Sequence, residues 1–144
     1  MTGEWELRKA TAADLPGVVE FLAPFMASRK LLQRSEVEIQ LLAANGFVVT
    51  VGSGDDEQII GFGAVEVYSR KMGEVQCLAV HNDFRRLGIG KQIVLACVGR
   101  ARSLGICELM AITSNDEFLR ECGFDYALPD QKRALFIQTS TDEP

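Results

Sequence analysis

The chain has 144 residues, 47% of them hydrophobic and 24% charged, which is the size and composition of one soluble globular domain. Its formal net charge of −5 argues against a nucleic-acid partner, because phosphate contacts need clustered Lys and Arg side chains. Since no apolar run reaches the roughly 18 residues of a membrane span and the N-terminus lacks a secretory signal, we expect a cytoplasmic protein with no membrane partner.

The first half of the chain predicts one strand, two helices and a hairpin of strands. Ser35 and Glu38 have the spacing of a capping box, which begins the second helix, and Asn45-Gly46 ends it. The turn-rich residues 52–56 join the two later strands. The predicted elements are the strand Trp5–Lys9, a helix that opens over Thr11–Pro16 and ends near Pro24, a helix from Ser35 to about Ala44, and the strands Phe47–Val51 and Gln58–Tyr68.

The second half alternates strands with helices. Apolar side chains recur every three or four residues from Ile89 to Leu104, which predicts a helix that ends at Gly105. The other predicted elements are the strands Gly73–Val80 and Leu109–Ile112, the short helix Asp116–Glu121, a strand that starts at Cys122 and a closing strand Ala134–Gln138. This order predicts an α/β (α+β) fold with a mixed sheet and helices on its faces. Residues 1–139 then form a single domain, and residues 140–144 a disordered tail.

The cysteines and the histidine give no sign of a metal or a disulfide. Cys77, Cys97, Cys107 and Cys122 are scattered without a C-x-x-C pair, and His81 is the single histidine. We therefore interpret the cysteines as reduced residues, with Cys77 and Cys97 in the core, and expect no metal.

The most informative stretch runs from Leu78 to Lys91. An apolar strand leads through a turn into a helix whose start carries Gly88 and Gly90, so backbone N–H groups can approach a ligand closely. The helix dipole favours an anion there, and three side chains add positive charge: Arg85, Arg86 and Lys91. The spacing fits neither a P-loop nor a dinucleotide fingerprint. We predict a pyrophosphate site, with a basic turn that binds nothing as the alternative.

This stretch resembles the GNAT family of acyl-CoA-dependent N-acetyltransferases. The resemblance rests on R-x-x-G-x-G at 85–90 after Leu-Ala-Val, on Asn115 and on Cys-Gly-Phe at 122–124, and it extends from Trp5 to Gln138. It implies a mostly antiparallel central sheet, acetyl-CoA as co-substrate, amides of residues 87–91 on the CoA pyrophosphate, and strand-like pairing of residues 78–80 with the pantetheine arm. The implied cofactor-binding residues are Leu78, Ala79, Val80, Arg85, Arg86, Leu87, Gly88, Ile89, Gly90, Lys91 and Asn115.

Acetyl transfer to an amine needs a base, because an amine is almost fully protonated at neutral pH. Glu74 is the favoured base. Regular alternation places four side chains on one face of the strand: Glu74, Gln76, Leu78 and Val80. A bulge between Glu74 and Leu78 would reverse that assignment, and a solvated Glu74 is the other alternative. Glu66 is the reserve candidate.

The general acid is less evident. The family often has a tyrosine four residues before the Gly-Phe pair, where this chain has Leu119, so Tyr126 is the substitute candidate, unless the thiolate leaves unassisted. A nucleophilic Cys77 would need an activating base, and none is visible. We interpret His81 as a turn residue.

The substrate end resembles the acetyltransferase domain of N-acetylglutamate synthases through residues 31–35, 73–80 and 128–133. This implies that Arg34, with Lys30 nearby, binds a substrate carboxylate, although a solvated loop charge is the alternative for Arg34. The chain lacks the Thr-Thr pair and the His-Trp-Phe run of that subgroup, and we expect no amino-acid-kinase domain before it to give feedback control.

The sequence therefore predicts a single acyl-CoA N-acyltransferase domain that moves an acetyl group from acetyl-CoA to a small-molecule primary amine by direct attack. The favoured acceptor is the α-amine of a small amino acid such as glutamate. A non-catalytic acyl-CoA-binding module and a peptide or protein N-acetyltransferase are the alternatives. Strands near the C-terminus could pair between two chains, so a homodimer stays open.

Overall fold

The central feature of the fold is a five-stranded sheet in the order β1-β2-β3-β4-β5. In the computed structural model, the residues described are 4–113, 116–125, 135, 137 and 139. The first three pairings are antiparallel and β4 pairs with β5 in parallel, so the predicted mixed, mostly antiparallel sheet is confirmed. The strands are β1 (Trp5–Lys9), β2 (Gly46–Val51), β3 (Gln58–Val67), β4 (Met72–Val80) and β5 (Glu108–Met110).

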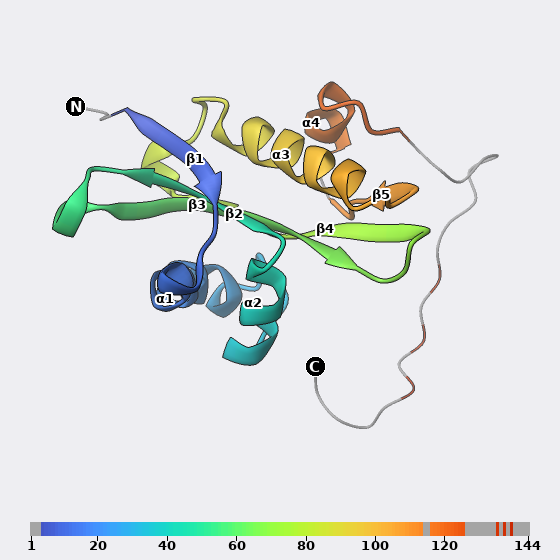
Figure 1. Ribbon diagram of the computed structural model, residues 1–144, viewed down its shortest axis with the longest axis horizontal. Helices are drawn as coiled ribbons and strands as arrows, with labels where there is room; N and C mark the ends of the chain where they lie inside the picture. Colours follow the sequence, from blue (N-terminus) through green and yellow to red (C-terminus); the bar gives the residue numbers. More distant parts are fainter. Residues whose placement is uncertain (1–3, 114–115, 126–134, 136, 138, 140–144) are drawn as a thin grey trace.

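Helices cover both faces of this sheet, as the sequence predicts. Figure 1 shows α1 and α2 on one face and α3 and α4 on the other. The α-helices are α1 (Leu15–Ala27), α2 (Glu36–Ala43), α3 (Ile89–Ser103) and α4 (Asp116–Glu121). Short 3-10 turns precede α1 at Ala12–Asp14 and lie between β2 and β3 at Gly54–Asp56 and between β4 and α3 at Asn82–Phe84.

The helix ends follow from local chemistry. Ser35 Oγ accepts a hydrogen bond from the Glu38 N–H, while the Glu38 carboxylate accepts one from the Ser35 N–H, so the predicted capping box begins α2. Pro24 lies inside α1, one turn before the helix ends at Ala27. Gly105 follows α3 with a φ of 74°, a conformation that glycine adopts without strain.

Each face of the sheet has its own core. Val18 and Leu22 of α1 and Ile39 of α2 pack on one face, and these side chains are at most 1% exposed. On the other face, Ile93 of α3 lies over the glycines of β3. A Cβ at Gly63 would clash with the Ile93 Cγ2 atom, so the absence of a side chain at this position lets α3 approach the sheet.

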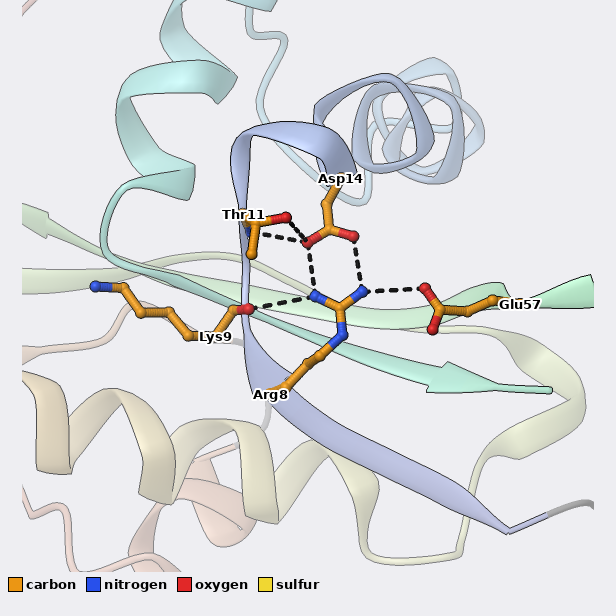
Figure 2. A network of polar contacts seen from close by, with 5 residues as sticks. All are labelled: Arg8, Lys9, Thr11, Asp14 and Glu57. Atoms are coloured by element: carbon orange, nitrogen blue, oxygen red, sulfur yellow. Dashed lines mark hydrogen bonds and ion pairs between the residues drawn. The ribbon is translucent and has the colours of Figure 1, made fainter. Parts of the chain in front are cut away.

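A polar network joins the edge strand to the first helix. Figure 2 shows the Arg8 guanidinium of β1 between the carboxylates of Asp14, at the start of α1, and Glu57, in the β2–β3 loop. The Asp14 carboxylate also accepts hydrogen bonds from the Thr11 N–H and hydroxyl. The network therefore fixes the start of α1 relative to β1 and the β2–β3 loop.

Three expectations concern the C-terminal part. The prediction that a strand starts at Cys122 is wrong for the residues described. The Cys122 and Phe124 N–H groups instead donate to the Leu119 carbonyl, which closes the end of α4 as a turn. Most of the predicted strand Ala134–Gln138 and the tail at 140–144 lie outside the described residues. Within the described ranges, no helix has the length and apolar character needed to cross a membrane.

Candidate functional site

Strand β4 contains a β-bulge in the middle of its length. Its register with β3 shifts between Phe62 and Ala64. Two β4 residues, Cys77 and Leu78, therefore lie opposite Gly63 alone. Cys77 has a φ of 57°, a left-handed backbone conformation that costs a non-glycine residue about 1 kcal/mol or more.

This bulge changes which side chains share a face of β4. Glu74 pairs with Glu66, whose carboxylate lies 3.6 Å from Arg34 beside α2, so both glutamates are on the α1 and α2 face. Leu78 and Val80 instead pack in the core that α3 covers. Regular alternation predicts that one face of β4 carries the side chains of Glu74, Gln76, Leu78 and Val80. This prediction is therefore wrong. The bulge that the sequence left open as the alternative is what the structure has.

Strands β4 and β5 pair only briefly. The ladder joins Met72–Glu74 to Glu108–Met110, and among the residues described no strand pairs with this edge of β4 beyond Glu74. The unpaired edge includes Leu78–Val80, the stretch expected from the family resemblance to pair with a pantetheine arm. An extended ligand could add there as a strand does at any open sheet edge.

The loop after β4 leads backbone N–H groups into the start of α3. Arg86 and Gly88 have positive φ values of 68° and 79°, which turn the chain into the helix. The Gln92 N–H donates to the Gly88 carbonyl, so the N–H groups of residues 89–91 precede the first helical bond. Those N–H groups and the helix dipole favour an anion such as a pyrophosphate.

The residues predicted to bind the pyrophosphate differ in exposure. The side chains of Arg85, Arg86 and Leu87 are exposed, Lys91 is half-buried and Ile89 is 1% exposed in the core. The Ile89 side chain therefore anchors the helix start, and only its backbone is available to a ligand.

Glycine is favoured at positions 88 and 90 for different structural reasons. A Cβ at Gly88 would meet no atom within 4 Å, so its positive φ is what favours glycine. A Cβ at Gly90 would lie 3.3 Å from the Phe118 Cζ atom and 3.8 Å from the Val80 Cγ2 atom. Gly90 thus permits the close approach of α4 to the loop.

A cluster of polar side chains lies on the opposite face, at the point where β4 leaves β5. Glu74 is 8% exposed, and its Oε1 accepts a 2.5 Å hydrogen bond from the Tyr68 hydroxyl. The same hydroxyl lies 3.1 Å from the Glu66 Oε1 and 3.4 Å from the Gln76 Nε2. The alternative of a solvated Glu74 is therefore wrong. Tyr68 is 53% exposed, and the partial desolvation of its hydroxyl, with the hydrogen bond to Glu74, raises the pKa of Tyr68 to about 12.

Arg34 joins this cluster from the loop before α2. Its side chain is 12% exposed and lies 3.6 Å from the Glu66 carboxylate and 3.8 Å from the Glu38 carboxylate, which contradicts the alternative of a solvated loop charge. Among the buried side-chain polar atoms of the described residues, the Arg34 Nε is the one that has no hydrogen-bond partner. Arg34 and Glu66 also line a hollow of about 310 Å³ between α2 and β3.

The structure describes one further residue that the sequence predicts at the substrate end, Lys30. Lys30 is exposed in the loop after α1. Leu119 is 6% exposed in the core, so an apolar side chain fills the family's usual general-acid position. Asn115 and Tyr126 lie outside the described residues.

The surroundings of Cys77 and His81 indicate structural and not catalytic roles. Burial raises the pKa of the Cys77 thiol and outweighs the opposing effect of the Arg34 charge, so its thiolate form is disfavoured. The His81 Nδ1 accepts a hydrogen bond from the Asp83 N–H, as expected for a turn residue. No group of three or more His, Cys, Asp or Glu within the described part of the chain could hold a metal ion.

Sequence reasoning missed Tyr68 and the role of Glu38 as a partner of Arg34. The signal for Tyr68 is its spacing: two residues after Glu66 at the end of a strand, it lies on the same face as Glu66. Nothing in the spacing indicates that its hydroxyl reaches across the hairpin to Glu74.

Comparison with known proteins agrees with this architecture. The sequence model of the acetyltransferase (GNAT) family matches residues 15–124, more than half of the chain. The chain is 33% identical over 134 residues to an amino-acid acetyltransferase of Mannheimia succiniciproducens, covering 89% of this chain and 30% of the relative. It is 32% identical over 133 residues to the amino-acid acetyltransferase of Pasteurella multocida, covering 88% and 29%. The chain thus spans less than a third of the length of these relatives.

Solved structures of other proteins also share the architecture of this chain. The N-acetylglutamate synthase of Neisseria gonorrhoeae, complexed with coenzyme A and N-acetyl-glutamate, superposes with a TM-score of 0.73 at 25% identity, over 92% of this chain and 31% of that one. The Rv2747 protein of Mycobacterium tuberculosis, in complex with CoA, superposes with a TM-score of 0.70 at 25% identity, over 82% of this chain and 70% of that one. With the β4 edge and the glycine loop in the places that the sequence predicts, and with the family match over residues 15–124, the chain belongs to the acetyltransferase (GNAT) family.

Proposed function

We propose that this chain is an acetyl-CoA-dependent N-acetyltransferase whose acceptor is the α-amine of a small amino acid. The observation that carries the proposal is the position of Glu74. It is the last β4 residue in the parallel ladder with β5, its carboxylate is on the α1 and α2 face, and the unpaired β4 edge begins directly after it. A base is thus next to the strand edge that would hold the pantetheine arm. The relatives named amino-acid acetyltransferase support the acceptor class.

Cofactor binding and proton transfer would take place on opposite faces of the sheet. Acetyl-CoA supplies the thioester, and the N–H groups that begin α3, with Arg85, Arg86 and Lys91, would hold its pyrophosphate. The Glu74 carboxylate would accept a proton from the acceptor ammonium and so produce the neutral amine that attacks the carbonyl directly. A backbone N–H within Leu78–Val80 would stabilise the developing oxyanion. A thiol has a pKa of about 8.5, so the thiolate can leave without protonation by a general acid, which position 119 does not supply.

Glutamate is the acceptor that we propose first. The buried Arg34 Nε has a hydrogen to donate and no acceptor, and a substrate carboxylate would supply one. The solved relative from Neisseria gonorrhoeae was crystallised with N-acetyl-glutamate, which supports the same acceptor. Since Glu38 and Glu66 already face Arg34, the carboxylate would have to approach from the Nε side of the guanidinium group.

A second function has one observation in its favour. Leu119 fills the usual general-acid position with a buried apolar side chain, as a module that binds acyl-CoA without chemistry would tolerate. The buried Glu74 carboxylate, held by the half-exposed Tyr68, has no evident use in such a module. Product formation with any amine separates the two functions.

The experiment is a calorimetric titration of acetyl-CoA, followed by mass-spectrometric detection of acetylated amino acids, glutamate first. The Gly90→Glu variant adds bulk and negative charge at the α3 start and should lose binding. Gly99→Glu is the matched control, because Gly99 lies exposed in the same helix with no atom within 4 Å of its Cβ position. Binding by the wild type and the control without any acetylated product would favour the binding module. No binding by the wild type would overturn both functions, and acetylation of peptides alone would show a peptide acetyltransferase.

A further inference from the structure

The Tyr68 hydroxyl is shared between two carboxylates. Its oxygen lies 2.5 Å from the Glu74 Oε1 and 3.1 Å from the Glu66 Oε1. A phenol has one proton to donate, so it cannot serve both carboxylates at once. The shorter contact identifies Glu74 as the acceptor. The hydroxyl oxygen can in turn accept a hydrogen bond from the Gln76 amide, 3.4 Å away.

The backbone holds Tyr68 in place for this contact. Tyr68 follows β3 in the β3–β4 hairpin, and the Tyr68 and Ser69 N–H groups both donate to the Met72 carbonyl. The Arg70 and Lys71 carbonyls of the same turn accept hydrogen bonds from the Cys107 and Glu108 N–H groups at the start of β5. The turn is therefore fixed to the sheet on both sides, and the phenol enters the site from a rigid position.

We propose that Tyr68 is a positioning residue for Glu74 and that it determines which of the two paired glutamates acts as the base. This inference rests on the proposed acetyltransferase function and adds a residue to it. With Oε1 of Glu74 held by the phenol, its Oε2 is left to accept the proton of the acceptor amine. Glu66 faces Glu74 across the strands, and its Oε1 lies 3.6 Å from the Arg34 Nη2 as well as 3.1 Å from the Tyr68 hydroxyl.

The charges around the cluster make this division necessary. Directly opposite like charges on neighbouring strands repel, and Glu66 and Glu74 occupy such a pair. Among the residues described, the charged and titratable side chains that face them are Arg34 from the loop before α2, Glu38 from α2, Cys77 from β4 and Tyr68 from the hairpin. Arg34 is shared between Glu38 and Glu66, which leaves the neutral phenol as the donor to Glu74. Because the pKa of Tyr68 is raised to about 12, this donor keeps its proton throughout the working pH range.

The test is the Tyr68→Phe variant, which keeps the ring and removes only the hydroxyl. We expect kcat to fall about tenfold, as for loss of one hydrogen bond to a charged group, with the KM and the Kd for acetyl-CoA unchanged. Tyr68→Phe should add little to the loss already caused by Glu74→Gln, because the two act as a unit.

A second measurement does not depend on activity. Ultraviolet titration of the wild type should show one phenol that titrates about two pH units above an ordinary tyrosine. That step should be absent in Tyr68→Phe and should move to lower pH in Glu74→Gln.

Each outcome decides between the two proposals. If the wild type acetylates an amine and Tyr68→Phe matches it in kcat, the positioning role is overturned and the acetyltransferase function stands. If the wild type acetylates no amine, the proposed function fails and the positioning role fails with it, even where the titration shows the hydrogen bond. If no phenol titrates late, the bond to Glu74 is absent and this inference alone is overturned.

Discussion

Arg8 and Asp14 form a two-point ion pair between the edge strand β1 and the start of α1. The Arg8 Nη1 lies 2.7 Å from the Asp14 Oδ2, and the Nη2 lies 2.8 Å from the Oδ1. The Asp14 carboxylate is 9% exposed, so water screens the pair poorly. The hydrogen bonds from Arg8, assisted by Thr11 and opposed by burial, lower the pKa of Asp14 to about 2.

The first prediction concerns stability and its dependence on pH. A carboxyl whose pKa falls from 3.8 to about 2 on folding contributes about 2 kcal/mol to the free energy of unfolding. Because the folded pKa is the lower one, this contribution is complete above about pH 5 and is lost as the pH falls through about 2. We expect Asp14→Asn to lower the free energy of unfolding by about that amount at pH 7. Urea unfolding of both proteins should show the difference shrinking below pH 4, and a constant difference would contradict the assignment.

The second prediction tests the contact between α3 and β3. A Cβ at Gly63 would overlap the Cγ2 atom of Ile93, a side chain with no exposed surface. Gly63→Ala should therefore cost about 1–3 kcal/mol of unfolding free energy, as overpacking does in other cores. Adding Ile93→Ala removes the overlapping atom, so the double variant should lose less than the sum of the two single variants. Additive losses in urea unfolding would show that the overlap is relieved elsewhere.

Much of the fold can be predicted from this sequence because its signals are local. The capping box at Ser35, the glycine after α3 and the turn-rich residues between β2 and β3 each depend on residues a few positions apart. The β4 bulge cannot be predicted in this way. It depends on the register with β3 and on a positive φ at Cys77, a residue with no intrinsic preference for that conformation.

The candidate site likewise has one part that depends on local sequence and one part that depends on tertiary contacts. The glycine loop has a sequence signature, since backbone N–H groups need glycines and a helix start in fixed order. The Glu74 cluster has none, because its members come from a loop, a helix and two strands. The hydrogen bond from Tyr68 and the ion pair from Arg34 to Glu66 exist only once the hairpin and α2 are in place. Sequence reasoning therefore found Glu74 and Arg34 separately and missed the phenol between the carboxylates.

The third prediction separates the two roles of glycine in and near the loop. Gly88→Ala places a Cβ in open space but forces a positive φ of 79° on alanine, which should cost about 1–2 kcal/mol locally. We expect calorimetry to show acetyl-CoA binding weakened about tenfold, because the helix start that presents the N–H groups is strained. Gly99→Ala, in the same helix, should bind acetyl-CoA as the wild type does and raise the unfolding free energy by up to about 1 kcal/mol. Equal binding by both variants would show that the backbone at Gly88 does not matter to the ligand.

The last prediction compares the two glutamates that face each other across β3 and β4. Glu74→Gln keeps the size of the side chain and can still accept the hydrogen bond from Tyr68, but it cannot accept a proton from the amine. We expect kcat to fall by about a hundredfold or more, with the Kd for acetyl-CoA unchanged, because the loop that would bind CoA is on the other side of β4. Glu66→Gln is the matched control, since it removes the same charge at the opposing strand position and should lower kcat far less. Steady-state kinetics on both variants settle the assignment. A large loss in Glu66→Gln with normal turnover in Glu74→Gln would transfer the role of base to Glu66 and leave Glu74 as its support.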